Sequence, residues 1–191
     1  MRALFLVMVL LVGAGGCASA PRLDVRRPAD RERLVDMYLA EFCSSELLRT
    51  QIGEAIHDVM MRLPPEALDK VLDRRRPVLF TEMYDVGTAK IASSSEIIVG
   101  PKDVPAFQEG MTILKLSTAL NNGPKEAVMG IVAHELAHRV LDHVRRGQTT
   151  CKAEREANRL VKAWGFVKEY QVASDQFGSK KTGDHVASCQ E

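Results

Sequence analysis

The stretch "GIVAHELAHRVLDH", residues 130–143, places two histidines and a glutamate within an apolar run. Apolar residues occupy nearly every side of the helix that this pattern predicts, so we expect the helix to be buried. Residues four apart on a helix lie one turn apart on the same face, so His134 and His138 can direct their imidazole nitrogens at one point. Glu135 follows about 100° around the helix and would lie beside that point.

This H-E-x-x-H pattern is best explained by a bound metal ion. A buried carboxylate without a partner costs several kcal/mol, and two ordinary core histidines would not offset that cost. Neutral imidazole is a good ligand for zinc, which makes its bound water acidic. We therefore predict that His134 and His138 bind one Zn²⁺ and that Glu135 is the general base that takes a proton from the zinc-bound water.

A catalytic zinc site also needs a third protein ligand and an open position for water. A third histidine six residues after the second is excluded, because Val144 occupies that position and Leu141 replaces the glycine that would bend the chain. On a continuing helix His143 would point about 180° away from His134, which predicts a surface or second-layer position for it.

The next predicted helix supplies two acidic candidates within "CKAEREANRL", residues 151–160. Glu154 and Asn158 lie one turn apart and would approach the site together. We expect Glu154 to be the third zinc ligand and Asn158 to hydrogen-bond a ligand histidine and fix its ring. Glu156 is the alternative ligand, but it lies on a different side of the helix, and we expect it to be solvated.

Length and composition restrict the other possibilities. The chain has 191 residues and a formal net charge of +1, which fits one domain with short appendages and gives no general attraction to nucleic acid. The sequence contains no glycine-rich phosphate loop, no G-x-S-x-G elbow and no C-x-x-C pair. We therefore expect no nucleic-acid partner.

The N-terminus has the features of a secretory signal. An apolar run over residues 3–12 follows a positively charged start and is too short to span a membrane comfortably as a mature helix. "AGGC", residues 14–17, resembles a bacterial lipobox with alanine in place of the usual leucine. We predict residues 1–16 as signal peptide and Cys17 as a lipid attachment site at the periplasmic face of the bacterial cell envelope. The alternative, cleavage after Ala20, would give a soluble periplasmic or secreted protein.

An envelope protein lies in an oxidising compartment, where cysteines form disulfides. If Cys17 carries lipid, three cysteines remain for at most one disulfide, namely Cys43, Cys151 and Cys189. The sequence does not choose among the three possible pairings.

Hydrophobic periodicity predicts an α+β fold rather than a parallel doubly wound sheet. Helices are expected from residue 30, over 46–62, briefly at "PPEAL", and over 125–143 and 150–163. Strands, or a hairpin and a strand, are expected within 77–86, 89–100 and 111–117. The predicted segments are a tether (17–29), an N-terminal helical segment (30–75), a core (76–170) and a polar C-terminal tail (171–191).

"HELAH", residues 134–138, followed by "EREAN", residues 154–158, resembles the gluzincin metallopeptidases. The resemblance is strongest to the branch with the CAAX prenyl endopeptidases, their HtpX-like bacterial relatives and the minigluzincins. Their pattern is H-E-x-x-H and then E-x-x-A-D, so Asn158 departs from the family aspartate and brings no negative charge. The resemblance covers about residues 77–166. It implies a zincin-like fold with N-terminal helices, a small, mainly antiparallel sheet, an active-site helix and a glutamate helix.

This resemblance implies a zinc-dependent endopeptidase that hydrolyses peptide bonds of protein substrates in the cell envelope. An extended peptide would pair with an edge strand above the zinc. The strand residues expected to bind substrate are Thr112, Ile113, Leu114, Lys115, Leu116 and Ser117. Candidates for an oxyanion donor are Tyr84, Arg155 and Tyr170. The alternative is a non-catalytic zinc-containing lipoprotein that binds a protein partner in its groove.

Overall fold

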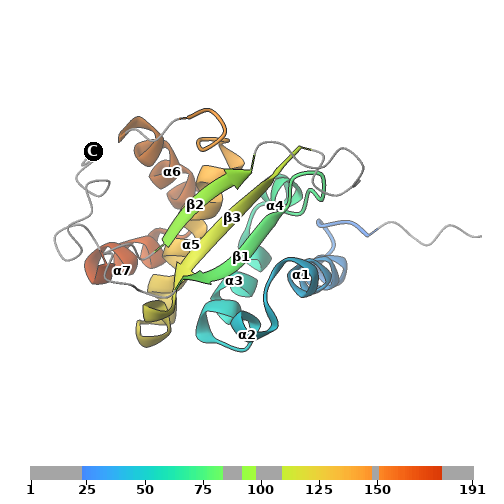
Figure 1. Cartoon of the computed structure of the whole chain (residues 1–191), viewed down its shortest axis with the longest axis horizontal. Coiled ribbons are helices and arrows are strands. Elements are labelled where there is room, and N and C mark those ends of the chain that lie inside the picture. The colour runs from blue at the N-terminus through green and yellow to red at the C-terminus, as the bar shows by residue number, and fades with distance from the viewer. Residues whose placement is uncertain (1–22, 84–91, 98–108, 148–150, 178–191) are drawn as a thin grey trace, which may run out of the picture.

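The computed structural model describes residues 23–83, 92–97, 109–147 and 151–177, which form a mixed α+β fold (Figure 1). Four helices come first: α1 (Pro28–Phe42), α2 (Ser45–Leu48), α3 (Gln51–Arg62) and α4 (Pro65–Val71). Three strands follow: β1 (Val78–Met83), β2 (Ala92–Ile97) and β3 (Met111–Ser117). The chain then forms a 3-10 turn, η1 (Thr118–Asn122), and three helices: α5 (Lys125–Val140), α6 (Cys151–Ala163) and α7 (Val167–Phe177). The predicted α+β class is confirmed.

The start of the described chain packs against the domain. Val25 is buried, and its carbonyl oxygen accepts a hydrogen bond of 2.9 Å from Arg31 Nε. Helix α1 begins at Pro28, so the predicted tether over 17–29 is wrong in its last part. The predicted signal peptide and Cys17 lie outside the described residues. Within the described ranges, no helix combines the length and apolar character needed to cross a membrane.

Helices α2 and α3 replace the single helix expected over 46–62. Thr50 starts a new helix, because its side-chain oxygen accepts a hydrogen bond from the backbone N–H of Gly53. Ser44 caps α2 in the same way, accepting from Leu47. Hydroxyl side chains at these positions satisfy backbone donors that a helix start leaves free. The local capping residues therefore divided a continuous hydrophobic pattern into two helices.

The three described strands form one sheet in the order β1-β3-β2. Strand β1 runs parallel to β3, with Val78 opposite Thr112. Strand β2 runs antiparallel to β3, with Ala92 opposite Leu116. The expected hairpin is wrong because β3 separates the other two strands. The sheet is also not mainly antiparallel, because it has one ladder of each kind.

The predicted edge position of the 111–117 strand is wrong. Strand β3 is central, and its backbone pairs with β1 on one side and β2 on the other. The residues predicted to bind substrate therefore cannot pair with an added peptide strand. The residues concerned are Thr112, Ile113, Leu114, Lys115, Leu116 and Ser117. Thr112 and Ser117 are buried despite their polarity.

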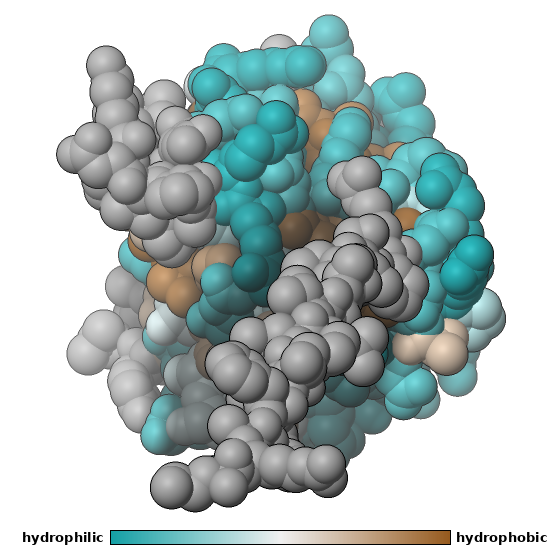
Figure 2. Space-filling model, turned by 90° about the vertical axis from the view of Figure 1, so that its right-hand side faces the viewer, coloured by the Kyte–Doolittle hydropathy of each residue, from teal (hydrophilic) through white to brown (hydrophobic). Residues whose placement is uncertain are grey.

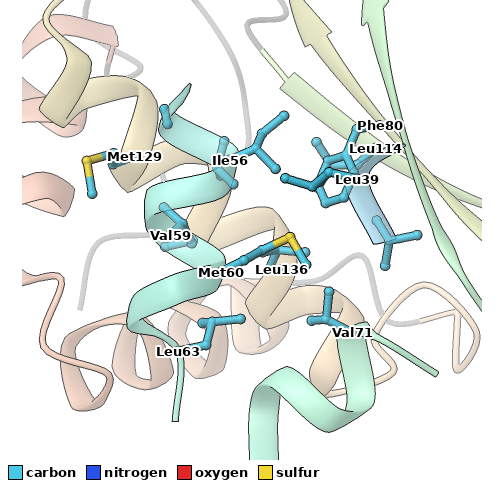
Figure 3. Close-up of a cluster of buried hydrophobic side chains, with 14 of the residues drawn as sticks. Leu39, Ile56, Val59, Met60, Leu63, Val71, Phe80, Leu114, Met129 and Leu136 are labelled. Carbon is cyan, nitrogen blue, oxygen red and sulfur yellow. The ribbon is translucent and has the colours of Figure 1, made fainter. Parts of the chain in front are cut away.

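One hydrophobic core joins the N-terminal helices to the sheet and α5 (Figure 3). Leu39 of α1, Ile56 of α3, Phe80 of β1, Leu114 of β3 and Leu136 of α5 all belong to it. The predicted segments 30–75 and 76–170 thus share their interior. On the face shown in Figure 2, hydrophilic residues predominate over the described surface and apolar residues show in small areas.

Helix α7 was not predicted and shortens the expected C-terminal tail. Residues 171–177 complete this helix, so the described chain is ordered as helix up to Phe177. Glu169 of α7 accepts a hydrogen bond of 2.6 Å from Arg62 of α3, and Ala173 is buried. These contacts hold α7 against α3, and α7 also packs on α5.

Gly130 of α5 allows the close approach of α7, and its replacement by alanine is our first prediction. A Cβ atom at Gly130 would lie 2.3 Å from the carbonyl oxygen of Glu169, so one helix must move. We expect Gly130→Ala to lower the free energy of unfolding by about 1–3 kcal/mol, despite the better helix propensity of alanine. Urea denaturation measures this change, and an unchanged midpoint would contradict the close packing.

Candidate metal centre

Helices α5 and α6 pack together and bring three predicted ligands to one place. His134 and His138 project from α5, and Glu154 projects from the first turn of α6. The Nε2 atoms of the two histidines are 3.0 Å apart. Glu154 Oε2 lies 3.0 Å from His134 Nε2, and Glu154 Oε1 lies 3.3 Å from His138 Nε2. The structure therefore brings together the three residues that the sequence selected as ligands.

These distances and donor types fit a tetrahedral zinc ion. Bonds of about 2.0–2.1 Å to zinc give a tetrahedron with edges of about 3.3 Å, close to the separations of 3.0–3.3 Å observed here. The three candidate ligand atoms all lie within 4.8 Å of one another. Lone pairs of two imidazoles and a carboxylate repel one another at such distances unless a proton or a metal ion lies between them.

The electrostatics of the cluster favour a cation. Burial acts to raise the pKa of Glu154, but the contacts of its carboxylate with His134 and then His138, at 3.0 and 3.3 Å, outweigh burial and lower the pKa of Glu154 to about 2. Burial acts to lower the pKa of His134, but the hydrogen bond to Glu154 and the charge of Glu135 raise it above its ordinary value. The cluster is therefore a buried position that attracts positive charge.

Glu135 lies beside the cluster rather than within it. Its side chain is half-buried on α5, and it is absent from the group of described residues whose ligand atoms converge. Its negative charge nevertheless acts on His134 and raises the pKa of that histidine. This placement is the one expected for a base that acts next to a metal-bound water.

Asn158 lies one turn after Glu154 on α6 and interacts with His134. The buried Asn158 Oδ1 and His134 Nδ1 atoms do not meet strict hydrogen-bond geometry with any described partner. They are close enough for Asn158 to raise the pKa of His134 through hydrogen bonding. The predicted hydrogen bond between Asn158 and a ligand histidine therefore stays a prediction.

The turn after α5 changes the direction that the sequence analysis expected for His143. Helix α5 ends at Val140, and Asp142 adopts a left-handed conformation with φ of 60°. The backbone N–H of Asp142 donates to the carbonyl of Arg139 at 3.2 Å, and that of His143 donates to His138 at 3.1 Å. This pair of bonds defines a Schellman motif, so the helix expected to continue to His143 stops earlier.

The Schellman motif turns His143 back onto a predicted metal ligand. His143 is buried, and its Nδ1 lies 3.0 Å from Nδ1 of His138. Its Nε2 lies 3.1 Å from Oε2 of Glu156. Of the two positions expected for His143, the second-layer position is correct. The expectation that Glu156 is solvated is wrong, because this carboxylate binds His143 and is only partly exposed.

Two of the three oxyanion candidates lie within the described residues, on different helices. Tyr170 packs against the hydrophobic core from α7, with Lys162 Nζ 5.4 Å from its ring centroid. Arg155 is half-buried on α6 next to Glu154 in sequence. Tyr84 lies outside the described residues. The oxyanion donor therefore stays a prediction with three candidates.

The cysteines divide into one free and one bonded residue within the described chain. Cys43 is a buried free thiol, and burial raises its pKa to about 12. Cys151, the first residue of α6, is disulfide-bonded. Two of the three possible pairings include Cys43 and are excluded. Of the three pairings left open, only that of Cys151 with Cys189 is compatible with a free Cys43, and Cys189 lies outside the described residues.

Comparisons with protein-family models, with curated proteins and with solved structures gave no match to this chain. The interpretation of the site therefore depends on its own geometry and chemistry. Two observations support a metal site: the short distances among His134, His138 and Glu154, and the position of Glu135 beside them.

Proposed function

We propose that this protein is a zinc-dependent endopeptidase of the bacterial cell envelope with a zincin-like core. The observation that carries the proposal is the convergence of His134, His138 and Glu154 at separations of 3.0–3.3 Å. A purely structural zinc site has four protein ligands and no base beside it. Here three ligands converge from two helices, and a carboxylate follows the first ligand directly in sequence.

The proposed reaction is hydrolysis of a peptide bond. His134, His138 and Glu154 would hold the zinc, which when bound makes its water acidic and polarises the scissile carbonyl. Glu135 accepts a proton from the attacking water as the new carbon–oxygen bond forms. Glu135 then donates that proton to the leaving nitrogen as the carbon–nitrogen bond breaks. Asn158 lies close enough to raise the pKa of His134, and its side chain would hold the ring of that histidine in place.

Strand β2 takes the substrate-pairing role that the sequence analysis gave to β3. Within the described residues, β2 pairs with β3 along one side, and it packs against the metal-binding helix α5. An extended substrate that adds to the outer side of β2 would lie along the sheet edge next to the site. Backbone pairing would then bind many sequences, which suits an endopeptidase that acts on proteins.

The cell-envelope location is proposed from the N-terminal sequence. The apolar run over residues 3–12 and the lipobox-like stretch ending at Cys17 favour export and a lipid anchor. The anchor would place the proposed peptidase at the periplasmic face of a membrane, within reach of envelope proteins. Signal-peptidase cleavage after Ala20 would give the same domain in soluble form.

Cleavage of an unfolded protein such as casein tests the proposal. We expect the purified protein to cleave casein, a chelator to abolish cleavage, and added Zn²⁺ to restore it. A second candidate function is a non-catalytic zinc lipoprotein that binds a protein partner, which the replacement of the family aspartate by Asn158 favours. Bound zinc without cleavage of casein or other unfolded substrates would support this second function and contradict the first.

A further inference from the structure

We propose that His143 and Glu156 act as a positioning pair that fixes the hydrogen of His138 on Nδ1. This leaves the Nε2 lone pair of His138 directed at the metal position. The inference rests on the proposed metal site and adds two residues to it. Neither was selected as a positioning residue from the sequence, because Glu156 was expected to be solvated and His143 was expected to point away.

The positions of the hydrogens follow from Glu156, the last residue in the hydrogen-bonded series from His138 through His143. A carboxylate can only accept hydrogen bonds, so the contact of 3.1 Å between Glu156 Oε2 and His143 Nε2 requires a hydrogen on that nitrogen. A neutral His143 then has a bare Nδ1, which must accept the hydrogen bond of 3.0 Å from Nδ1 of His138. His138 therefore carries its hydrogen on Nδ1.

The opposite nitrogen of His138 is the one that faces the other ligands. His138 Nε2 lies 3.0 Å from His134 Nε2 and 3.3 Å from Glu154 Oε1. A metal ligand must offer a bare nitrogen, and the hydrogen bond made by the other ring nitrogen decides which one is bare. The hydrogen bonds from Glu156 to His143 and from His143 to His138 thus select the tautomer of His138 that can bind a metal ion.

The backbone around His143 is held rigidly enough for this role. Asp142, which turns the chain, pairs with the guanidinium groups of Arg76 and Arg139. Arg139 is itself buried and donates to the carbonyl oxygen of Arg76 at 2.7 Å. The side chain of His143 is 2% exposed, so water does not compete freely for its Nδ1.

Two substitutions at His143 separate positioning from simple packing. Asparagine can place its Oδ1 near the position of the histidine Nδ1 and still accept from His138, whereas leucine fills space but accepts nothing. We expect His143→Leu to weaken zinc binding about 10–100-fold, the range typical of partners behind metal ligands. We expect His143→Asn to recover most of that loss. Competition with a chromophoric chelator measures the affinity.

A substitution at Glu156 tests the pair without changing the buried ring of His143. Glu156→Ala removes the acceptor that orients His143, and we expect about a 10-fold loss of zinc affinity. Glu126→Ala, at the first turn of α5, is the control and should retain wild-type affinity, because Glu126 contacts Lys168 on the surface. Thermal unfolding of each metal-free variant identifies any that fail to fold.

Nitrogen NMR of ¹⁵N-histidine-labelled protein reads the tautomer directly and does not depend on activity. We expect His138 to carry its hydrogen on Nδ1 in both metal-free and zinc-loaded wild type. A hydrogen on Nε2 in the metal-free protein, or wild-type zinc affinity in folded His143→Leu and Glu156→Ala, would overturn the inference. Zinc binding with the expected losses but without peptide cleavage would overturn the peptidase proposal alone.

Discussion

Glu135→Gln is expected to remove nearly all peptide hydrolysis while leaving zinc bound. Glutamine keeps the size of the side chain but cannot take a proton from water at neutral pH. General-base catalysis contributes on the order of 10²–10⁴-fold to rates, so we expect kcat to fall by about that factor. Zinc content should not change, because Glu135 is absent from the converging ligand group of the described residues.

The control for this variant is the same substitution elsewhere on α5. Glu126→Gln lies in the first turn of that helix and is half exposed, so we expect its activity and zinc content to match the wild type. Activity is measured as the initial rate of casein cleavage, and zinc as metal bound per protein after dialysis. Full activity in Glu135→Gln would exclude Glu135 as the base, and loss of zinc would make it part of the metal-binding shell.

The convergence of His134 and His138 could be predicted from sequence because their spacing is a local property. His134 and His138 are separated by one helical turn, which fixes their relative position whatever the rest of the chain does. Glu154 was selected over Glu156 because Asn158 shares its side of α6. That argument required α5 and α6 to be neighbours, and the packing of the two helices bears it out.

The direction of the His143 side chain, and with it the contact to Glu156, was predicted wrongly because one residue ended a helix without the usual signal. Glycine is the common residue in the left-handed position that closes a helix, whereas here Asp142 occupies it. Aspartate adopts this conformation more often than most residues. The arginines that hold it, Arg76 and Arg139, come from two different parts of the chain. The only sequence feature that could have indicated the helix end was Asp142 followed by His143 at the end of the apolar helical pattern.

The strand order could not be predicted because pairing is not local. Three strands were located correctly, but alternation of polar and apolar residues reports which side chains are buried and not which strand lies alongside. Strand β3 lies between β1 and β2 in the sheet, although both of those strands precede it in the sequence. Helix α7 was missed because within it only Glu169 and Ala173 are buried, too few to produce a clear helical pattern.

The second large effect is expected for Glu154→Ala, because Glu154 is the proposed third zinc ligand. This substitution removes the carboxylate that lies within 3.3 Å of both histidine Nε2 atoms. Loss of one of three protein ligands should weaken zinc binding by more than about 100-fold, beyond the range expected for residues behind the ligands. Casein cleavage should disappear with the zinc. Affinity is measured by chelator competition on the folded metal-free protein.

Glu156→Ala is the matched comparison, because it removes the same group two residues later on α6. Its carboxylate contacts His143 rather than the converging nitrogens, so its smaller expected loss of about 10-fold should leave a measurable, zinc-dependent activity. The ratio between the two variants therefore distinguishes a residue that binds the ion from one that orients a ligand. A larger loss in Glu156→Ala than in Glu154→Ala would reverse the assignment, since the residue in direct contact with the ion must contribute more to its binding.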